Sequence, residues 1–227
     1  MYEPAQTDKE KVLLLGIDCQ NDFMDLEHSA LPVVGAMDDM TRLLDWMDKN
    51  LSKITSIAVT MDSHNVHQIF HSVWWKSADG LNPPPFTVIT ADDVSKGKWI
   101  PMVNPTASIQ YLAGLEAQPS KKKLCIWNTH CLIGSWGHSL EDRFAKMIHY
   151  HSVVRQTQVI KELKGSDPST EMYGCIKPEY SPTNNVNMKF INKLSMFNKV
   201  VITGQALSHC VLETLKQILE YATPDLS

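Results

Sequence analysis

The chain of 227 residues lacks the long apolar runs and the strong charge bias that mark several classes of protein. No apolar run is long enough to span a bilayer, and the N-terminal residues show no signal-peptide core. The formal net charge of −4 gives no basic excess for a polyanion such as nucleic acid. We therefore expect a cytoplasmic protein that binds neither membranes nor nucleic acid.

Paired cysteines are also missing. The five cysteines are an odd number, widely spaced and without a C-x-x-C motif, which argues against a disulfide framework and for a reducing compartment. No internal repeat and no linker-like stretch divides the chain. The length suits one large domain or two small ones, and we expect one domain over residues 1–227.

Apolar runs typical of strands alternate with segments of helical periodicity. The run 11–17 is almost continuously apolar, as in a strand covered on both faces. This alternation predicts βαβ units in a three-layer α/β/α fold with a mainly parallel, Rossmann-like sheet. The expected strands are 11–17, 54–61, 123–127, 153–160 and 199–203, and the expected helices are 40–51, 140–150, 183–197 and the segment after Cys210, with Val211, Leu215, Ile218 and Leu219 on one face.

A long insertion at about 72–120 interrupts this alternation and is rich in proline and tryptophan. It leaves the predicted sheet just after one group of reactive residues and returns just before another. Long insertions of this kind tend to form lids or pocket walls. We expect Trp74, Trp75 and Trp99 to cover a pocket and exclude water, with a surface decoration or an oligomer contact as the alternative.

Cys210 lies where the strand 199–203 gives way to a helical pattern. Free N–H groups and the helix dipole at such a position favour the thiolate, although a lone cysteine is more often buried and inert. Asp18 and Lys164 also follow predicted strands, and sites in parallel sheets form beyond the carboxyl ends of the strands. Asp18 is a candidate to accept the thiol proton and Lys164 to stabilise the thiolate. The N–H groups near Ala206 and Cys210 are candidates for an oxyanion hole.

Asp62 and His64 follow the strand 54–61, and His130 follows the run 123–127. Residues i and i+2 of an extended segment face the same side, so a carboxylate and two imidazoles can converge on one metal ion. Taken alone, the Asp62-x-His64 spacing is more often a solvated loop. His67 or His71 offers an additional ligand, and the spacing does not choose between them.

Five motifs resemble those of the nicotinamidase and isochorismatase-like cysteine hydrolases, in a branch with a larger insertion. The motifs are Ile17-Asp18-Cys19-Gln20-Asn21-Asp22-Phe23, Asp62-Ser63-His64, Trp127-Asn128-Thr129-His130-Cys131, Lys164-Gly165 followed by Thr170-Glu171-x-Tyr173, and Gly204-x-Ala206-x-Ser208-His209-Cys210-Val211. They occur in the family's order and extend over nearly the whole chain, so chance is a poor explanation for them.

The resemblance implies a role for each motif. The implied catalytic triad is Asp18, Lys164 and Cys210. The implied ligands of a divalent metal are Asp62, His64 and His130, with His71 nearby, and zinc is the first choice, followed by iron or manganese. The implied binding residues for a flat substrate ring are Phe23, Trp127 and Tyr173. The resemblance also implies a cis peptide between Gln205 and Ala206, a costly geometry kept at functional sites.

The activity implied by the resemblance is metal-dependent amide hydrolysis through a thioester on the cysteine. Nicotinamide, converted to nicotinate and ammonia, is the leading substrate, which would connect the enzyme to NAD salvage. Another small amide or carbamoyl compound is an alternative, as is a non-catalytic protein that binds a metal or ligand. Isochorismate is disfavoured because its hydrolysis does not use the cysteine. The expected partner is a small-molecule amide, and a homo-oligomer is compatible with the resemblance.

The sequence departs from the family pattern at four points. His67 is one residue short of the usual spacing of a fourth metal ligand, and His71 is the alternative. Asn128 stands where nicotinamidases usually have proline, and the distance from His64 to His130 is long because of the insertion. The chain stops at Ser227, soon after the helix expected to follow Cys210, whereas the family usually adds another strand and helix. A trimmed C-terminus and a smaller sheet are the two explanations for this last departure.

Overall fold

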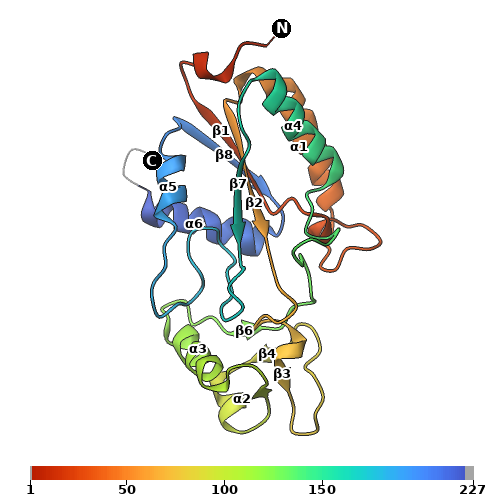
Figure 1. The fold of residues 1–227 in the computed structure, drawn as a ribbon, viewed down its shortest axis with the longest axis vertical. Helices are drawn as coiled ribbons and strands as arrows, with labels where there is room; N and C mark the ends of the chain where they lie inside the picture. The colour runs from red at the N-terminus through yellow and green to blue at the C-terminus, as the bar shows by residue number, and fades with distance from the viewer. Residues whose placement is uncertain (1, 223–227) are drawn as a thin grey trace.

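The computed structural model describes residues 2–222 of the chain. Its centre is a parallel sheet with the strand order β7-β2-β1-β8 (Figure 1). The register places Ile17 opposite Gly204 and Asp62 opposite Lys164, so the strands end together at one edge of the sheet. The strands are β1 (Val12–Ile17), β2 (Ser56–Asp62), β7 (Ile160–Lys164) and β8 (Lys199–Gly204).

Helices cover both faces of the sheet, which confirms the expected three-layer α/β/α architecture (Figure 1). The pair α1 (Ala36–Asn50) and α4 (Asp142–Val154) packs on one face, and the pair α5 (Met188–Leu194) and α6 (Leu212–Tyr221) packs on the other. Short 3-10 turns are η1 (Ala5–Thr7), η2 (Asn21–Phe23), η3 (Leu51–Lys53) and η4 (Ser72–Trp74), and η5 (Leu207–Val211) is a π-helical turn. Within residues 2–222, no helix has both the length and the apolar character needed to cross a bilayer.

The apolar run of β1 is buried on both faces, as its sequence predicts. Leu13, Leu15 and Ile17 pack against α5 and α6, whereas Leu14 packs against α1 and α4. Successive side chains of a strand point to opposite faces, so one uninterrupted run supplies both cores. The sheet therefore holds its carboxyl edge, where the motifs lie, between two packed layers.

The long insertion forms a compact lobe beyond the carboxyl edge of the sheet (Figure 1). Trp74 and Trp75 are buried there with Ile89 and Leu112 in a separate hydrophobic core. Residues on either side of the insertion, such as Phe70 and Ile126, belong to the same core. The elements of this lobe are β3 (Trp75–Lys76), β4 (Val88–Ile89), α2 (Ala91–Ser95), β5 (Ile100–Pro101), α3 (Pro105–Ala117) and β6 (Leu124–Cys125).

Two of the five expected strands are placed differently by the structure. The run 123–127 contributes only β6, which pairs antiparallel with β4 of the insertion and does not join the main sheet. The segment 153–160 is not a strand, because α4 continues to Val154 and the fourth sheet strand, β7, begins at Ile160. The expected helix 183–197 is shortened to α5.

The buried face of α6 differs from the expected apolar one. Val211 and Ile218 are buried, but Leu219 is 67% exposed and Leu215 is also exposed. The polar Gln217 is buried in their place, because its side chain accepts hydrogen bonds from the N–H groups of Ile176 and Lys177 and donates to the Lys177 carbonyl. A polar residue thus docks this helix onto a loop, which apolar periodicity alone does not predict.

Candidate active site

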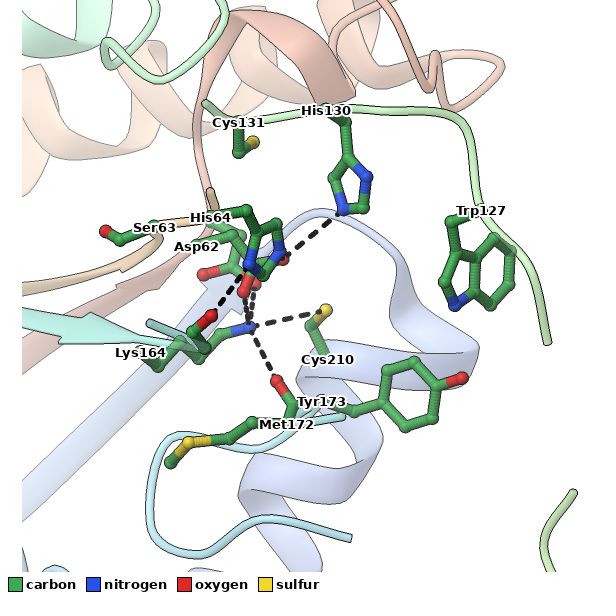
Figure 2. A network of polar contacts seen from close by, with 12 residues as sticks. Asp62, Ser63, His64, Trp127, His130, Cys131, Lys164, Met172, Tyr173 and Cys210 are labelled. Carbon is green, nitrogen blue, oxygen red and sulfur yellow. Dashed lines mark hydrogen bonds and ion pairs between the residues drawn. The ribbon is translucent and has the colours of Figure 1, made fainter. Parts of the chain in front are cut away.

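The expected reactive residues gather at the carboxyl edge of the sheet (Figure 2). Asp18 directly follows β1, Asp62 ends β2, and Lys164 ends β7. Cys210 lies in the π-helical turn η5, between β8 and α6. The three sheet strands and the turn thus deliver two carboxylates, an ammonium and a thiol to one buried place.

Lys164 is the centre of this group. Its Nζ lies 2.9 Å from Asp18 Oδ2 and 3.8 Å from Cys210 Sγ, and it also donates to Asp62 Oδ1. The Met172 carbonyl accepts a further hydrogen bond from it at 3.3 Å. Oxygens of Asp18 and Asp62 and the sulfur of Cys210 all lie within 4.8 Å of one another. The ammonium is therefore placed to hold negative charge on either the carboxylates or the sulfur.

Burial controls the protonation of this group. It raises the pKa of Asp18 and, more strongly, that of the Cys210 thiol. Burial opposes the charge on Lys164, but the Asp18 and Asp62 carboxylates outweigh it and raise the pKa of Lys164 well above its usual range. These shifts favour a neutral thiol beside the Lys164 cation, and formation of a thiolate would require transfer of the thiol proton to a neighbouring base.

The backbone around Cys210 turns sharply without the implied cis peptide. The bond between Gln205 and Ala206 is trans, and that expectation is wrong. The turn is made instead by Ala206, whose φ of 57° is in the left-handed region, before the π-helical turn begins. Ala206 accepts hydrogen bonds from the N–H groups of His209 and Val211, and both Ala206 and Cys210 line the adjoining pocket.

Asp62, His64 and His130 form a second group that touches the first. One oxygen of Asp62 and one ring nitrogen of each histidine all lie within 4.8 Å of one another, and all three residues are buried. His64 Nδ1 donates to the Gly165 carbonyl at 2.9 Å, and His130 Nδ1 donates to the Asn128 carbonyl at 2.7 Å. With Nδ1 as the donor in each ring, Nε2 faces Asp62 Oδ2, at 3.5 Å for His64 and 3.9 Å for His130. This donor set suits zinc and related divalent metals.

Gly165 is required for this arrangement. Its φ of 73° is in the left-handed region, and a Cβ at this position would lie only 2.6 Å from His64 Cε1. The glycine after Lys164 therefore lets the His64 ring reach its carbonyl partner.

His71, and not His67, lies beside this group. The His71 ring centroid is 6.1 Å from that of His64 and 5.9 Å from that of His130, whereas His67 is exposed. His71 Nδ1 donates to the Val66 carbonyl, and within residues 2–222 its buried Nε2 has no hydrogen-bond partner. Burial lowers the pKa of His71 to about 4, so this ring is neutral near pH 7, as a metal ligand must be.

A pocket of about 630 Å³ opens onto both groups. Phe23, Trp127 and Tyr173 line it together with Cys210 and Asp62. Phe23 packs edge-on against His130 with ring centroids 5.5 Å apart. In Figure 2, Trp127 and Tyr173 lie on the same side of the Cys210 sulfur. A flat ring bound between these aromatic residues would have its carbonyl substituent close to the thiol.

The tryptophans of the insertion do not cover this pocket. Trp74 and Trp75 are buried in the core of the lobe, and none of the three expected tryptophans is among the lining residues that the structure describes. The insertion contributes Phe86, which packs edge-on against Trp127. The expectation was wrong for the tryptophans, because paired apolar rings of that size find a drier environment in a core of their own.

Several supporting residues were not predicted from the sequence. Thr60 donates to Asp18 Oδ1 at 2.7 Å, and Gln20 bonds both the N–H and the carbonyl of Asp62. Glu171, which belongs to the motif before Tyr173, is buried at the pocket and accepts a hydrogen bond from Trp127 Nε1 at 3.1 Å. Gln20 and Glu171 lie inside the motifs, and this was the available signal that they have a role. Their contacts could not be predicted, because their partners come from distant segments of the chain.

Solved structures of nicotinamidases and pyrazinamidases are similar to this chain. The yeast nicotinamidase bound to the inhibitor nicotinaldehyde matches with a TM-score of 0.60 and 20% identity, over 89% of this chain and 79% of that chain. An Acinetobacter baumanii nicotinamidase and pyrazinamidase gives a TM-score of 0.62 and 16% identity, over 94% and 80%. A Pyrococcus horikoshii pyrazinamidase in complex with zinc gives 0.50 and 17%, over 92% and 79%.

No protein-family model matches the sequence, and no curated protein matches it. At the low identities of the solved structures, the likeness shows the fold alone. The α/β fold that this chain shares with nicotinamidases and pyrazinamidases is the one implied by its motifs.

Proposed function

We propose that the protein is a metal-dependent cysteine amidohydrolase that converts nicotinamide to nicotinate and ammonia. The observation that carries this proposal is the contact of Lys164 with Asp18, Asp62 and the Cys210 sulfur at the base of an aromatic pocket. A cysteine hydrolase needs a nucleophile, a base and a cation in one place, and these residues supply all three. The fold shared with nicotinamidases supports the choice of substrate.

In the first step, Asp18 accepts the proton of Cys210, and Lys164 stabilises the sulfur anion. The sulfur attacks the carbonyl carbon of the amide, and N–H groups at Ala206 and Cys210 stabilise the oxyanion. Asp18 gives its proton to the amide nitrogen, the C–N bond breaks, and ammonia leaves a thioester on Cys210. Burial raises the pKa of Asp18, which suits a group that must both accept and return a proton.

In the second step, water attacks the thioester carbonyl while Asp18 takes one of its protons. The C–S bond breaks, the carboxylic acid is released, and Asp18 returns the proton to the sulfur. Asp62, His64, His130 and His71 would hold the divalent metal, for which zinc is our choice. A metal there supplies a Lewis acid that orients the substrate and polarises water. In the cytoplasm, nicotinate produced this way would be available for NAD salvage.

The test is ammonia release from nicotinamide by protein loaded with zinc, compared with the Cys210→Ala variant. We expect turnover by the native protein and a loss of several orders of magnitude in the variant, because a covalent nucleophile is removed. The variant should still bind nicotinamide, since the pocket is otherwise intact. Near-normal activity of the variant would refute the role of Cys210. A metal-free protein that stays fully active after chelation would refute the role of the metal.

A further inference from the structure

The pocket continues well beyond the groups that would react. Cys210, Asp62 and His130 form its buried inner end. Its mouth is formed by apolar side chains at the surface, among them Leu207, which is 76% exposed, and Phe86, which is 61% exposed. Leu31 and Val33, from the loop before α1, complete the mouth. Exposed apolar side chains that converge around a cavity are a mark of ligand binding.

The lining of the mouth is mainly apolar and favours an uncharged group. Among the described residues that line the pocket, none is Lys or Arg, and the carboxyl groups of Asp62 and Glu171 are buried. The exposed polar side chains of the lining are Ser208 and His209, which form a hydrogen bond with each other at 2.9 Å. A charged substituent that entered the mouth would lose hydration and find no partner of opposite charge. An uncharged, apolar substituent would instead cover the exposed faces of Leu207 and Phe86 and gain from their burial.

The wall of the mouth is held in place by the residue that departs from the family pattern. Asn128 Nδ2 donates to the Ala30 carbonyl at 2.8 Å. The N–H of Leu31 donates to the Asp22 carbonyl, and the N–H of Val33 donates to the Phe23 carbonyl. A proline at position 128 could not make the first of these bonds. The loop that carries Leu31 and Val33 is therefore fixed before a ligand binds, which reduces the entropy lost on binding.

We propose that the substrate carries an uncharged apolar substituent, such as an alkyl chain or a second ring, on the ring that bears the carboxamide. A pocket of about 630 Å³ is in the range that encloses ligands larger than a single ring. The carboxamide lies at Cys210, and the substituent lies against Leu207 and Phe86. This inference rests on the proposed amide hydrolysis. Nicotinamide would then be the smallest substrate, with a lower kcat/KM than the best substituted amide.

The experiment compares nicotinamide with nicotinamides that carry methyl, propyl or phenyl at ring position 5 or 6. We expect the best substituted amide to have a kcat/KM about tenfold or more above that of nicotinamide, since even one methylene in an apolar pocket gains about tenfold. The Leu207→Ser and Asn128→Ala variants should lower this preference several-fold. Leu219→Ser is the matched control, because Leu219 is a similarly exposed leucine on α6 that does not line the pocket, and the preference should be unchanged.

Calorimetric binding to the Cys210→Ala variant separates this inference from the proposed function. If a substituted amide binds more tightly than nicotinamide, the apolar mouth is supported, whether or not any amide is hydrolysed. If no amide is hydrolysed, the proposed amide hydrolysis is refuted. Hydrolysis of nicotinamide without tighter binding or faster turnover of any substituted amide would overturn the inference and leave the proposed function standing.

Discussion

At the scale of single residues, the site depends on one buried ammonium between two carboxylates. Burial would raise the pKa of Asp62, but Lys164 and His64 hold it well below its usual range. Lys164 therefore keeps Asp62 ionised and available to a metal, while it also contacts Asp18 and Cys210. A single side chain thus links the proposed metal centre to the proposed nucleophile.

We expect Lys164→Met to lower the free energy of unfolding of the metal-free protein by about 3–5 kcal/mol, because it leaves two buried carboxylates without their cation. The measurement is urea unfolding near pH 7, followed by circular dichroism. Lys161→Met is the matched control, since Lys161 lies on the same strand but is exposed. Equal effects of the two substitutions would show that the buried ion pairs contribute little.

Glu171 is another buried carboxyl group at the pocket, and within residues 2–222 it forms no salt bridge. Burial raises its pKa to about 8, with the negative charges of Asp62 and Glu179 adding to the effect. Its two oxygens accept hydrogen bonds from Trp127 Nε1 and from the Met172 N–H. Since the Met172 carbonyl also accepts a hydrogen bond from Lys164, Glu171 connects the aromatic wall of the pocket to the proposed triad.

The raised pKa of Glu171 makes stability depend on pH in a predictable direction. In the unfolded chain, where the pKa of a glutamate is about 4.5, this proton is lost at lower pH, whereas the folded state keeps it up to about pH 8. Stability is therefore lost as the pH rises through this window, by up to about 1.4 kcal/mol per pH unit. Glu171→Gln should remove this slope in the metal-free protein. A variant whose unfolding free energy follows the native pH curve would contradict the assignment.

The sequence predicts where the reactive residues meet but not how they are supported. Asp18, Lys164 and Cys210 come together because each lies at or just beyond the carboxyl end of a parallel strand, which is where sites form in such sheets. Glu171 gives no such signal, because its partner Trp127 is brought to it by tertiary packing. The implied cis peptide was wrong, since a left-handed Ala206 provides the turn.

At the scale of elements, the segment after β2 decides which histidine completes the proposed metal site. Of two histidines four residues apart, His71 is buried with a free Nε2 and His67 is exposed. The sequence did not choose between them, because the segment 63–71 is irregular. It has no helical or strand periodicity that would predict which side chain points into the site. The choice follows from the hydrogen bond that turns the His71 ring, donated to the Val66 carbonyl.

His71→Gln should weaken zinc binding by about tenfold or more, because even indirect partners of metal ligands contribute about 10–100-fold to affinity. His67→Gln is the matched control and should bind zinc as the native protein does. Competition with a chromogenic chelator measures both affinities. If the two variants bind zinc equally well, His71 is not a ligand.

The strand expected at 123–127 shows why some elements were misplaced. Leu124 and Ile126 are buried, as the apolar run suggests, but they are buried in the core of the lobe and not in the main sheet. A segment buried in the lobe and a strand buried in the main sheet both give an apolar run in the sequence. Only the pairing of β6 with β4, about 36 residues earlier in the chain, distinguishes the two.

At the scale of the whole molecule, the insertion is a part of the structure on which the site rests. Its core includes Ile69, Phe70, Leu124 and Ile126, which flank the insertion in sequence. Phe70 also packs edge-on against His64, with ring centroids 4.9 Å apart. The lobe therefore packs against the proposed metal ligand His64 through Phe70, in addition to contributing Phe86 to the pocket.

Replacement of residues 72–120 by a short Gly/Ser bridge should prevent folding, and not merely open the pocket. The bridge would expose Phe70, Leu124 and Ile126, which are almost fully buried, and loss of a large buried apolar side chain typically costs about 2–5 kcal/mol. Phe86→Ala is the comparison, because Phe86 is largely exposed and its removal should leave the melting temperature nearly unchanged. Thermal unfolding by circular dichroism tests both. A bridged protein that unfolds cooperatively near the native temperature would show that the lobe is dispensable, and the lid interpretation of the insertion would then regain support.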